Sequence, residues 1–233
     1  MTDTIPTGID DDLRGVLERL GERICSDAEL EAYEAAEAVA ARRRLMEASG
    51  IVDVLPPEDV EALALNSYRD GRAIDLVTQF VAQTQLSVGR PILVLMGGTG
   101  LGKTVAAGWA LARTPGIFIE AGDLVRAQIA ADGRSPRSPD VERWRRLTRT
   151  GLLVVDELGT NRDVDDAQVA FREIINRRQD RRRPTILLGN IEPKVFWSRF
   201  DSRTRDRLRV CAFVRGLTGD SMRAPRRRDA DAR

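Results

Sequence analysis

The feature that most constrains the fold is a glycine-rich pattern, G-x-x-x-x-G-K-[ST], near the middle of this 233-residue chain. It consists of Gly97, Gly98, Thr99, Gly100, Leu101, Gly102, Lys103 and Thr104. An apolar run, residues 91–96, precedes it, and a helix-forming run, residues 105–112, follows it. Strand, glycine loop and helix in this order form a phosphate-binding P-loop, in which backbone N–H groups and the helix N-terminus hold phosphate oxygens. The pattern predicts that the chain binds a nucleoside triphosphate, ATP in our interpretation.

Lysine usage supports this interpretation. The chain has 37 Lys and Arg residues, and only Lys103 and Lys194 are lysines. A Lys ammonium is a compact point charge, whereas an Arg guanidinium is a wide planar fork, so the loop specifically requires a lysine at position 103. Lys103 is expected to reach the β- and γ-phosphates, and the Thr104 hydroxyl to ligate Mg²⁺.

A second motif follows the P-loop at the distance that a strand–helix unit requires. Residues 152–155 are apolar and end in Asp156 and Glu157, which is the Walker B form. Strand ends of parallel sheets converge on the ligand crevice, so Asp156 is predicted to hold Mg²⁺ and Glu157 to polarise the attacking water. The strand predicted at 185–188 ends near Asn190, which either contacts the water or γ-phosphate or is an ordinary turn residue.

The remaining pattern predicts the architecture. Apolar strands at 91–96, 116–119, 152–155, 185–188 and 210–214 alternate with helices, one from 123, then 141–149 and 166–178, which is typical of a parallel α/β sheet covered on both faces. Before the sheet we expect only helices: one opened by residues 10–12, one running from 26 to before 50, one at 59–65 and one at 72–82. We assign residues 1–70 to an acidic helical partner-binding module, 71–223 to the ATPase domain and 224–233 to a disordered basic tail.

Charge is divided between the two parts. Residues 1–88 hold 18 acidic and 8 basic side chains, and the rest of the chain holds 18 acidic and 29 basic ones. A basic half suits a polyanion and an acidic half suits a protein partner, although two solvated surfaces that attract each other, or helices packed on the ATPase core, fit the same numbers. The arginines predicted to meet DNA, or to form a solvated face, are Arg134, Arg137, Arg143, Arg145, Arg146 and Arg149.

Composition excludes several other classes of protein. Two cysteines, Cys25 and Cys211, without any histidine predict neither a zinc site nor a disulfide framework. No apolar run approaches the roughly 18 residues that span a bilayer, and no signal peptide is evident, so we expect a cytoplasmic protein without membrane contact. Aromatic residues make up 5% of the chain, so nucleic-acid binding should be mainly electrostatic rather than based on stacking.

Several segments resemble a known family in the correct order. Residues 171–178, 183–186 and 189–190 are similar to the stretch between Walker B and sensor 1 of DnaC-like helicase loaders and the related IstB transposition ATPases. Residues 206–209 and 219–223 resemble that family's arginine-finger helix and sensor 2 segment. The resemblance covers about residues 91–223 and implies a P-loop AAA+ fold, with Asn190 as sensor 1, Arg207 as the arginine finger and Arg223 as sensor 2. The strand before Asn190 ends in Leu-Leu-Gly where this family usually has a Thr, and the chain ends soon after Arg223.

The resemblance also implies a function. The leading hypothesis is an ATP-dependent loader of the replicative DNA helicase, which assembles into a multimer on single-stranded DNA and grips the helicase through its amino-terminal module. An alternative is an IstB-like transposition helper ATPase on duplex DNA. A small-molecule P-loop kinase is disfavoured by the adjacent Asp156 and Glu157, by Asn190 and by the lack of an evident acceptor lid.

Overall fold

The computed structural model describes residues 27–60, 72–86, 88–159, 164–219 and 221. Two compact units divide the chain between Ala41 and Arg42. The described part of the first unit is the amino-terminal stretch of helix α2 (Asp27–Ser49), and the second unit contains everything that follows. The helix predicted to open at residues 10–12 and the tail predicted at 224–233 lie outside the described residues.

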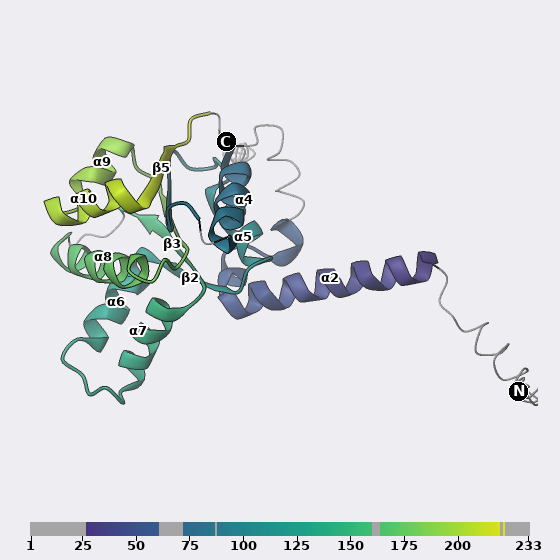
Figure 1. Cartoon of the computed structure of the whole chain (residues 1–233), viewed down its shortest axis with the longest axis horizontal. Coiled ribbons are helices and arrows are strands. Elements are labelled where there is room, and N and C mark those ends of the chain that lie inside the picture. Colours follow the sequence, from purple (N-terminus) through teal and green to yellow (C-terminus); the bar gives the residue numbers. More distant parts are fainter. Residues whose placement is uncertain (1–26, 61–71, 87, 160–163, 220, 222–233) are drawn as a thin grey trace, which may run out of the picture. The chain divides into compact units, whose positions relative to one another are not determined.

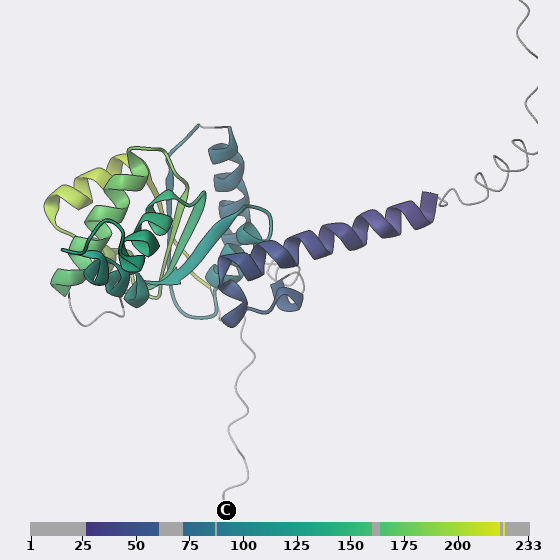
Figure 2. The same ribbon diagram turned by 90° about the horizontal axis from the view of Figure 1, so that it is seen from below.

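A five-stranded, fully parallel sheet forms the second unit's centre (Figures 1 and 2). Its strands are β1 (Ile92–Met96), β2 (Gly116–Glu120), β3 (Leu152–Leu158), β4 (Thr185–Gly189) and β5 (Ala212–Gly216). The strand order is β2-β3-β4-β1-β5, and every pair of neighbours is parallel. The predicted α/β fold class is confirmed.

The central strands are apolar because both faces of the sheet are covered. All five residues of β1 and of β4 are buried, whereas the edge strands β2 and β5 are partly exposed. Alternate residues of β1 enter different cores: Leu93 and Leu95 lie in one, and Ile92, Val94 and Met96 lie in the other. Side chains of a strand alternate between its two faces, so a continuous apolar run is what a central parallel strand requires.

Helices cover both faces (Figure 1). Helices α4 (Arg72–Gln85) and α5 (Lys103–Leu111) lie on one side. On the other side lie α6 (Ala121–Ala131), α7 (Pro139–Arg149), α8 (Val164–Gln179), α9 (Pro193–Ser198) and α10 (Ser202–Cys211). Ser138 caps α7 by accepting from the Asp140 N–H at 3.2 Å, and Asp201 caps α10 by accepting from the Thr204 N–H at 2.7 Å.

Residues 42–60 contribute to the core of the second unit, which we call the sheet unit. Met46, Ile51 of the short 3₁₀ helix η1 (Ile51–Asp53), Leu55 and Val60 belong to the same buried cluster as β1 and α5. A Cβ atom on Gly108 of α5 would lie 2.8 Å from Leu55 Cδ2, so this glycine permits the close approach. Residues 42–60 therefore belong to the compact unit that holds the sheet. The assignment of residues 1–70 to a partner-binding module stays a prediction.

Helix α2 ends at Ser49, as predicted for the helix expected to stop before residue 50, and Met46 and Ser49 near its end are buried. Another predicted boundary differs from the structure. The fifth strand begins at Ala212 and not at Val210, because α10 runs on to the buried Cys211. No helix in the described ranges is long and apolar enough to cross a membrane.

A fully buried guanidinium joins the starts of two central strands. Arg178, near the end of α8, has 0% of its surface exposed. Its nitrogens donate to five oxygens at 2.7–3.0 Å, which belong to Leu147, Thr150, Gly151, Pro184 and the Thr185 hydroxyl. Burial lowers the pKa of Arg178 to about 9, so the group is still charged at neutral pH. One cation thus ties the end of α7 to the first residues of β3 and β4.

Candidate nucleotide site

The P-loop connects β1 to α5 through glycines that no other residue replaces without strain. Gly97, Gly100 and Gly102 have φ angles of 145°, 80° and 73°, in the region that favours glycine. A Cβ on Gly97 would lie 2.4 Å from the Leu217 carbonyl oxygen, and one on Gly100 would lie 2.0 Å from Ser221 Oγ. The segment that follows β5 therefore lies directly against the loop, and the loop's curvature depends on its glycines.

Lys103 begins α5, and its side chain lies across the loop. Its Nζ atom donates to the carbonyl oxygens of Gly97 at 3.0 Å and Gly98 at 2.7 Å. Only 5% of Lys103 is exposed. The ammonium is thus held beside the loop at the amino-terminal end of α5, where backbone N–H groups and the helix dipole favour an anion.

Oxygen atoms from two motifs meet beside this lysine. The Thr104 hydroxyl donates to Oδ2 of Asp156 at 2.8 Å, and Asp156 lies near the end of β3 with 7% exposure. A hydroxyl and a single carboxylate fit Mg²⁺, which takes few protein ligands and completes its shell with water and substrate phosphates. In the described ranges no three Asp, Glu, His or Cys side chains are grouped so as to hold a metal by themselves. Thr104 and Asp156 would hold Mg²⁺, which would neutralise phosphate charge.

Glu157 occupies an unusual backbone position. Its φ is 59°, in the left-handed region that a non-glycine residue rarely adopts. The pairing of β3 with β4 shifts between Val155 and Leu158, while the matching residues of β4 are Leu187 and Gly189. The extra residue makes a β-bulge, and bulges redirect side chains at functional sites. The Glu157 N–H also donates to Asp156 Oδ1 at 2.6 Å, which fixes the two acids relative to each other.

One cleft of about 270 Å³ contains most of the predicted site. Its walls include Thr99, Gly100, Leu101, Gly102, Lys103, Thr104, Asp156, Glu157 and Asn190. The structure therefore brings the P-loop, the Walker B acids and Asn190 to one place, at the carboxyl ends of β1, β3 and β4. Side chains at this edge can bind a triphosphate and act on its γ-phosphate.

Five further residues of the cleft were not predicted from the sequence as site residues: Val54, Leu55, Val105, Phe118 and Glu120. Glu120 ends β2 and is the register partner of Asp156. An acid at the end of a predicted strand was an available signal for Glu120. Val54 and Leu55 lie far before β1 in the sequence, and no local sequence pattern indicates that they line the cleft.

Arg207 does not line this cleft. It lies on α10, and its Nη1 atom contacts Gln179 Oε1 at 3.1 Å and Asp180 Oδ1 at 3.3 Å, at the carboxyl end of α8. Helix α8 leaves the cleft edge after β3 and returns the chain to the start of β4, so its carboxyl end lies at the opposite edge of the sheet. About a third of the Arg207 side chain is exposed. Its role as an arginine finger acting on a neighbouring subunit stays a prediction.

Arg223 lies outside the described residues. The nearby described segment approaches the P-loop, because the Leu217 N–H donates to the Met96 carbonyl oxygen at 2.6 Å and Ser221 lies beside Gly100. The sensor 2 assignment stays a prediction.

Half of the predicted DNA-binding arginines share one groove. Arg143, Arg146 and Arg149, spaced three residues apart on α7, line it together with Leu45 and Ala48. Arg145 instead donates to the Pro136 carbonyl oxygen at 2.8 Å, and Arg134 and Arg137 are exposed outside this groove. The regular spacing puts three cations on one helical face.

By sequence, the chain matches no protein-family model and no curated protein. By structure, it resembles a DnaC helicase loader with a TM-score of 0.51 and 22% identity over 63% of this chain and 89% of that one. It also resembles replication initiator DnaA bound to AMPPCP and single-stranded DNA (TM-score 0.51, 18% identity, 64% of this chain and 48% of that one). A DNA replication initiation factor is similar too (TM-score 0.50, 18% identity, 64% and 47%).

These similarities establish the fold. The chain has the AAA+ fold, and its predicted likeness to DnaC-like proteins is confirmed at that level. The matched region spans less than half the length of the two initiator chains.

Proposed function

We propose that this chain is an ATPase that loads the replicative DNA helicase onto single-stranded DNA as part of an ATP-dependent multimer. The observation that carries the proposal is the convergence of Lys103, Thr104, Asp156, Glu157 and Asn190 on one cleft. The choice of helicase loading rests on the motif resemblance between residues 91 and 223 and is supported by the structural similarity to a DnaC helicase loader.

The chain's own groups divide the work of binding ATP. Backbone N–H groups of the P-loop and the start of α5 hold phosphate oxygens, and Lys103 neutralises charge on the β- and γ-phosphates. Hydrogen bonds to two loop carbonyl oxygens hold the Lys103 ammonium at the loop. Thr104 and Asp156 position the Mg²⁺ that accompanies the nucleotide.

Hydrolysis requires a base and an orienting group near the γ-phosphate. The bulge aims Glu157 at the cleft, where its carboxylate accepts a proton from the attacking water. Asn190 donates from its amide to the water or the γ-phosphate. Arg207 supplies positive charge to the γ-phosphate of a neighbouring subunit in the assembly, so hydrolysis depends on assembly.

Single-stranded DNA is proposed to follow the groove on α7. Arg143, Arg146 and Arg149 present three guanidinium groups to phosphates, so the affinity should fall steeply with salt. The low aromatic content of the chain leaves little binding energy to base stacking. Substituting the three with Gln should reduce the salt slope as well as the affinity, whereas Arg177→Gln, an exposed arginine of α8, should change neither.

The deciding experiment is a reconstitution with the replicative helicase of the source organism. Light scattering after size-exclusion chromatography should show a stoichiometric complex, and ATP should promote transfer of the helicase to a single-stranded DNA circle. Deletion of residues 1–41, which form a separate compact unit, should abolish the complex and preserve ATP binding by the sheet unit.

The same reconstitution distinguishes the alternative. If the chain ignores the helicase and instead coats duplex DNA when ATP is present, the transposition-helper function replaces helicase loading. The nucleotide site is unaffected by that outcome, because both functions use the same ATPase core.

A further inference from the structure

The guanidinium of Arg207 is held at one nitrogen only. Its Nη1 atom donates to Gln179 Oε1 at 3.1 Å and to Asp180 Oδ1 at 3.3 Å, and about a third of the side chain is exposed. Among the described residues, the Nε and Nη2 atoms of Arg207 have no hydrogen-bond acceptor. Because a guanidinium is a rigid planar fork, two acceptors on one nitrogen fix the direction in which the Nε–Nη2 edge points.

The two acceptors lie on a well-fixed turn at the end of α8. The Arg182 N–H donates to the Gln179 carbonyl oxygen at 2.9 Å. The Arg183 N–H donates to the Arg178 carbonyl oxygen at 2.9 Å, which completes a Schellman motif. Arg182 occupies the left-handed position of this motif with a φ of 50°, where glycine is usual. Its Nη2 atom donates to the Gly89 carbonyl oxygen at 2.7 Å, so a long-range contact stabilises the turn.

The buried Arg178 fixes the same helix end to the sheet. It directly precedes Gln179, and its five hydrogen bonds join α8 to the end of α7 and to the starts of β3 and β4. Gln179 and Asp180 are thus attached to the centre of the domain, whereas Arg207 comes from α10. The contact sets the orientation of a surface cation by reference to the sheet.

Stability does not explain this contact, because exposed ion pairs contribute little to it and the Asp180 side chain is 66% exposed. Helix α10 carries three other arginines, and within the described ranges none of them donates a hydrogen bond to another element. Arg209, for example, pairs with Asp206 of its own helix at 3.0 Å. Arg207 is therefore singled out on α10 by how its guanidinium is oriented.

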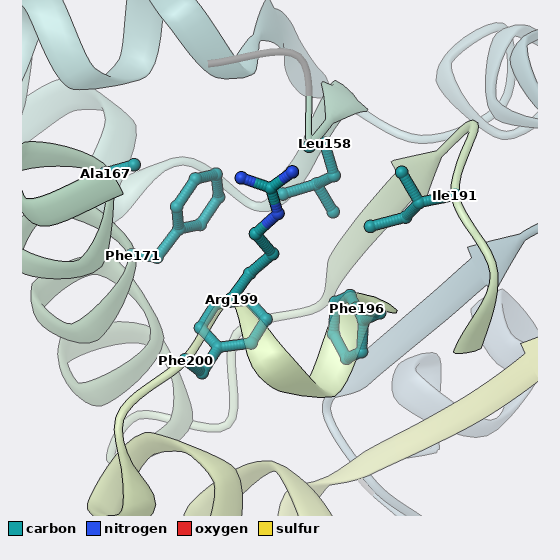
Figure 3. A pocket seen from close by; sticks show the side chains of 8 residues that line it. Leu158, Ala167, Phe171, Ile191, Phe196, Arg199 and Phe200 are labelled. Carbon is teal, nitrogen blue, oxygen red and sulfur yellow. The ribbon is translucent and has the colours of Figure 1, made fainter. Parts of the chain in front are cut away.

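Arg199, at the end of α9, has a different environment (Figure 3). Its guanidinium lies between the Phe171 ring and Leu158, over a small pocket that Ile191 also lines. This pocket measures about 30 Å³, which is room for a water molecule and not for a phosphate group. Arg207 instead lies at the surface, where an anion carried by another molecule can reach it.

We propose that Gln179 and Asp180 are positioning residues, which hold Nη1 of Arg207 so that its Nε–Nη2 edge faces a phosphate group carried by another molecule. A guanidinium edge binds two phosphate oxygens at once, so its direction matters as well as its charge. The identity of the phosphate rests on the proposed function, in which it is the γ-phosphate of ATP bound to a neighbouring copy of the chain. The holding of Arg207 does not depend on that function.

Two double variants of the full-length chain test the positioning role. Gln179→Leu with Asp180→Ala removes both acceptors, whereas Gln179→Glu with Asp180→Asn keeps an acceptor at each position and the same net charge. Removal should lower the assembly-dependent kcat roughly 10-fold or more, because a misplacement of about 1 Å can cost 10²-fold. The KM for ATP should stay unchanged, which separates this effect from a loss of nucleotide binding. The acceptor-keeping variant should retain the wild-type rate.

A matched control is Asp123→Ala, which removes the carboxylate of a surface ion pair with Arg126 on α6. It should change neither kcat nor KM. A similar loss of kcat in this variant, or in the acceptor-keeping variant, would overturn the proposal, because the effect would then not depend on the acceptors of Arg207.

NMR of the Arg207 guanidinium gives a measurement that needs no ATP. In the wild-type chain, restrained rotation about the Cζ–Nη1 bond should give a separate Hη1 signal, assigned by its absence from the Arg207→Lys spectrum. In the variant without acceptors, this rotation should become fast and the signal should average with the other Hη signals. Equal rotation rates in the two proteins would overturn the positioning role.

The combined results distinguish the two proposals. If Arg207→Ala lowers turnover and removal of both acceptors leaves it unchanged or raises it, the positioning role is wrong and the proposed function stands. If Arg207→Ala leaves turnover intact while NMR shows a held guanidinium, Gln179 and Asp180 still position Arg207, and the γ-phosphate of a neighbour is refuted as its target.

Discussion

The Thr104 hydroxyl donates a 2.8 Å hydrogen bond to the Asp156 carboxylate, which joins residues 52 positions apart in the chain. Thr104 lies in the first turn of α5, and Asp156 lies near the end of β3, two strands away from β1 across the sheet. The contact exists because parallel strands place their carboxyl ends at one edge. It fixes the P-loop and the Walker B acids in one frame, on which the first predictions depend.

Lys103→Ala should abolish measurable ATP binding. Loss of a close charge contact costs roughly 2–5 kcal/mol, which is about thirty- to several-thousand-fold in affinity. Isothermal titration calorimetry measures the effect, and Lys194→Ala, which changes the chain's other lysine on α9, is the matched control. Normal affinity in Lys103→Ala protein would disprove the P-loop assignment.

Glu157→Gln should separate binding from turnover. The amide keeps the shape of the side chain but does not accept the proton of the attacking water, so turnover should fall roughly 10²- to 10⁴-fold while ATP still binds. Phosphate release and calorimetry together check this. Glu192→Gln, at the exposed start of α9, is the control; a Glu157→Gln protein that hydrolyses ATP normally would show that another group is the base.

Arg207→Ala should leave the ATP affinity of the monomer almost unchanged, because Arg207 lies away from its own cleft beside Gln179 and Asp180. Assembly-dependent hydrolysis should fall strongly; in GTPases a charge supplied in trans is worth about 10³- to 10⁵-fold, and we expect a smaller factor here. Mixing Arg207→Ala with Lys103→Ala protein should restore part of the activity.

The comparison with other arginines of α10 makes this prediction specific. Arg203→Ala and Arg209→Ala, both at exposed positions, serve as controls with the same charge change. If one of them abolishes turnover while Arg207→Ala does not, the alignment that makes Arg207 the arginine finger is wrong.

Arg178→Met should destabilise the sheet unit by at least about 3 kcal/mol, because each buried acceptor left without a donor costs about 1–3 kcal/mol. The substitution leaves the carbonyl oxygens at the ends of α7 and the starts of β3 and β4 without their donor. Urea unfolding measures it. Arg177→Met, next in sequence but 57% exposed in an ion pair with Glu173, should cost no more than about 1 kcal/mol.

Cys211 should be unreactive in the folded chain. Burial raises the pKa of its thiol to about 11, and the residue is 4% exposed. In a Cys25→Ser background, a thiol reagent at pH 8 should modify Cys211 only after unfolding. Since the folded state holds this proton more tightly than the unfolded state, the free energy of unfolding should fall as the pH rises from about 9 towards 11; rapid modification of the folded protein would contradict the burial.

Much of this site was readable from the sequence, for local reasons. A P-loop needs glycines at defined positions, a strand before it and a helix after it. All of these are visible in the local sequence around Gly97 to Thr104, so the loop can be predicted without the structure. Asp156, Glu157 and Asn190 could be predicted as neighbours because the ends of buried strands are visible as polar residues after apolar runs, and all three line one cleft. Parallel pairing followed from strands that are apolar on both faces.

The tertiary structure decided what depends on contacts between distant segments. Packing across the sheet determines the order of the strands, the bulge at Glu157 and the burial of Arg178. It also places Leu55 both in a hydrophobic core and in the lining of the cleft. The sequence by itself determined where the P-loop and the strand-end acids lie in the chain, because backbone conformation and periodicity are local properties. Which side chains surround them, including Arg199 beside the loops that follow β3 and β4, was decided only when long-range packing brought those segments together.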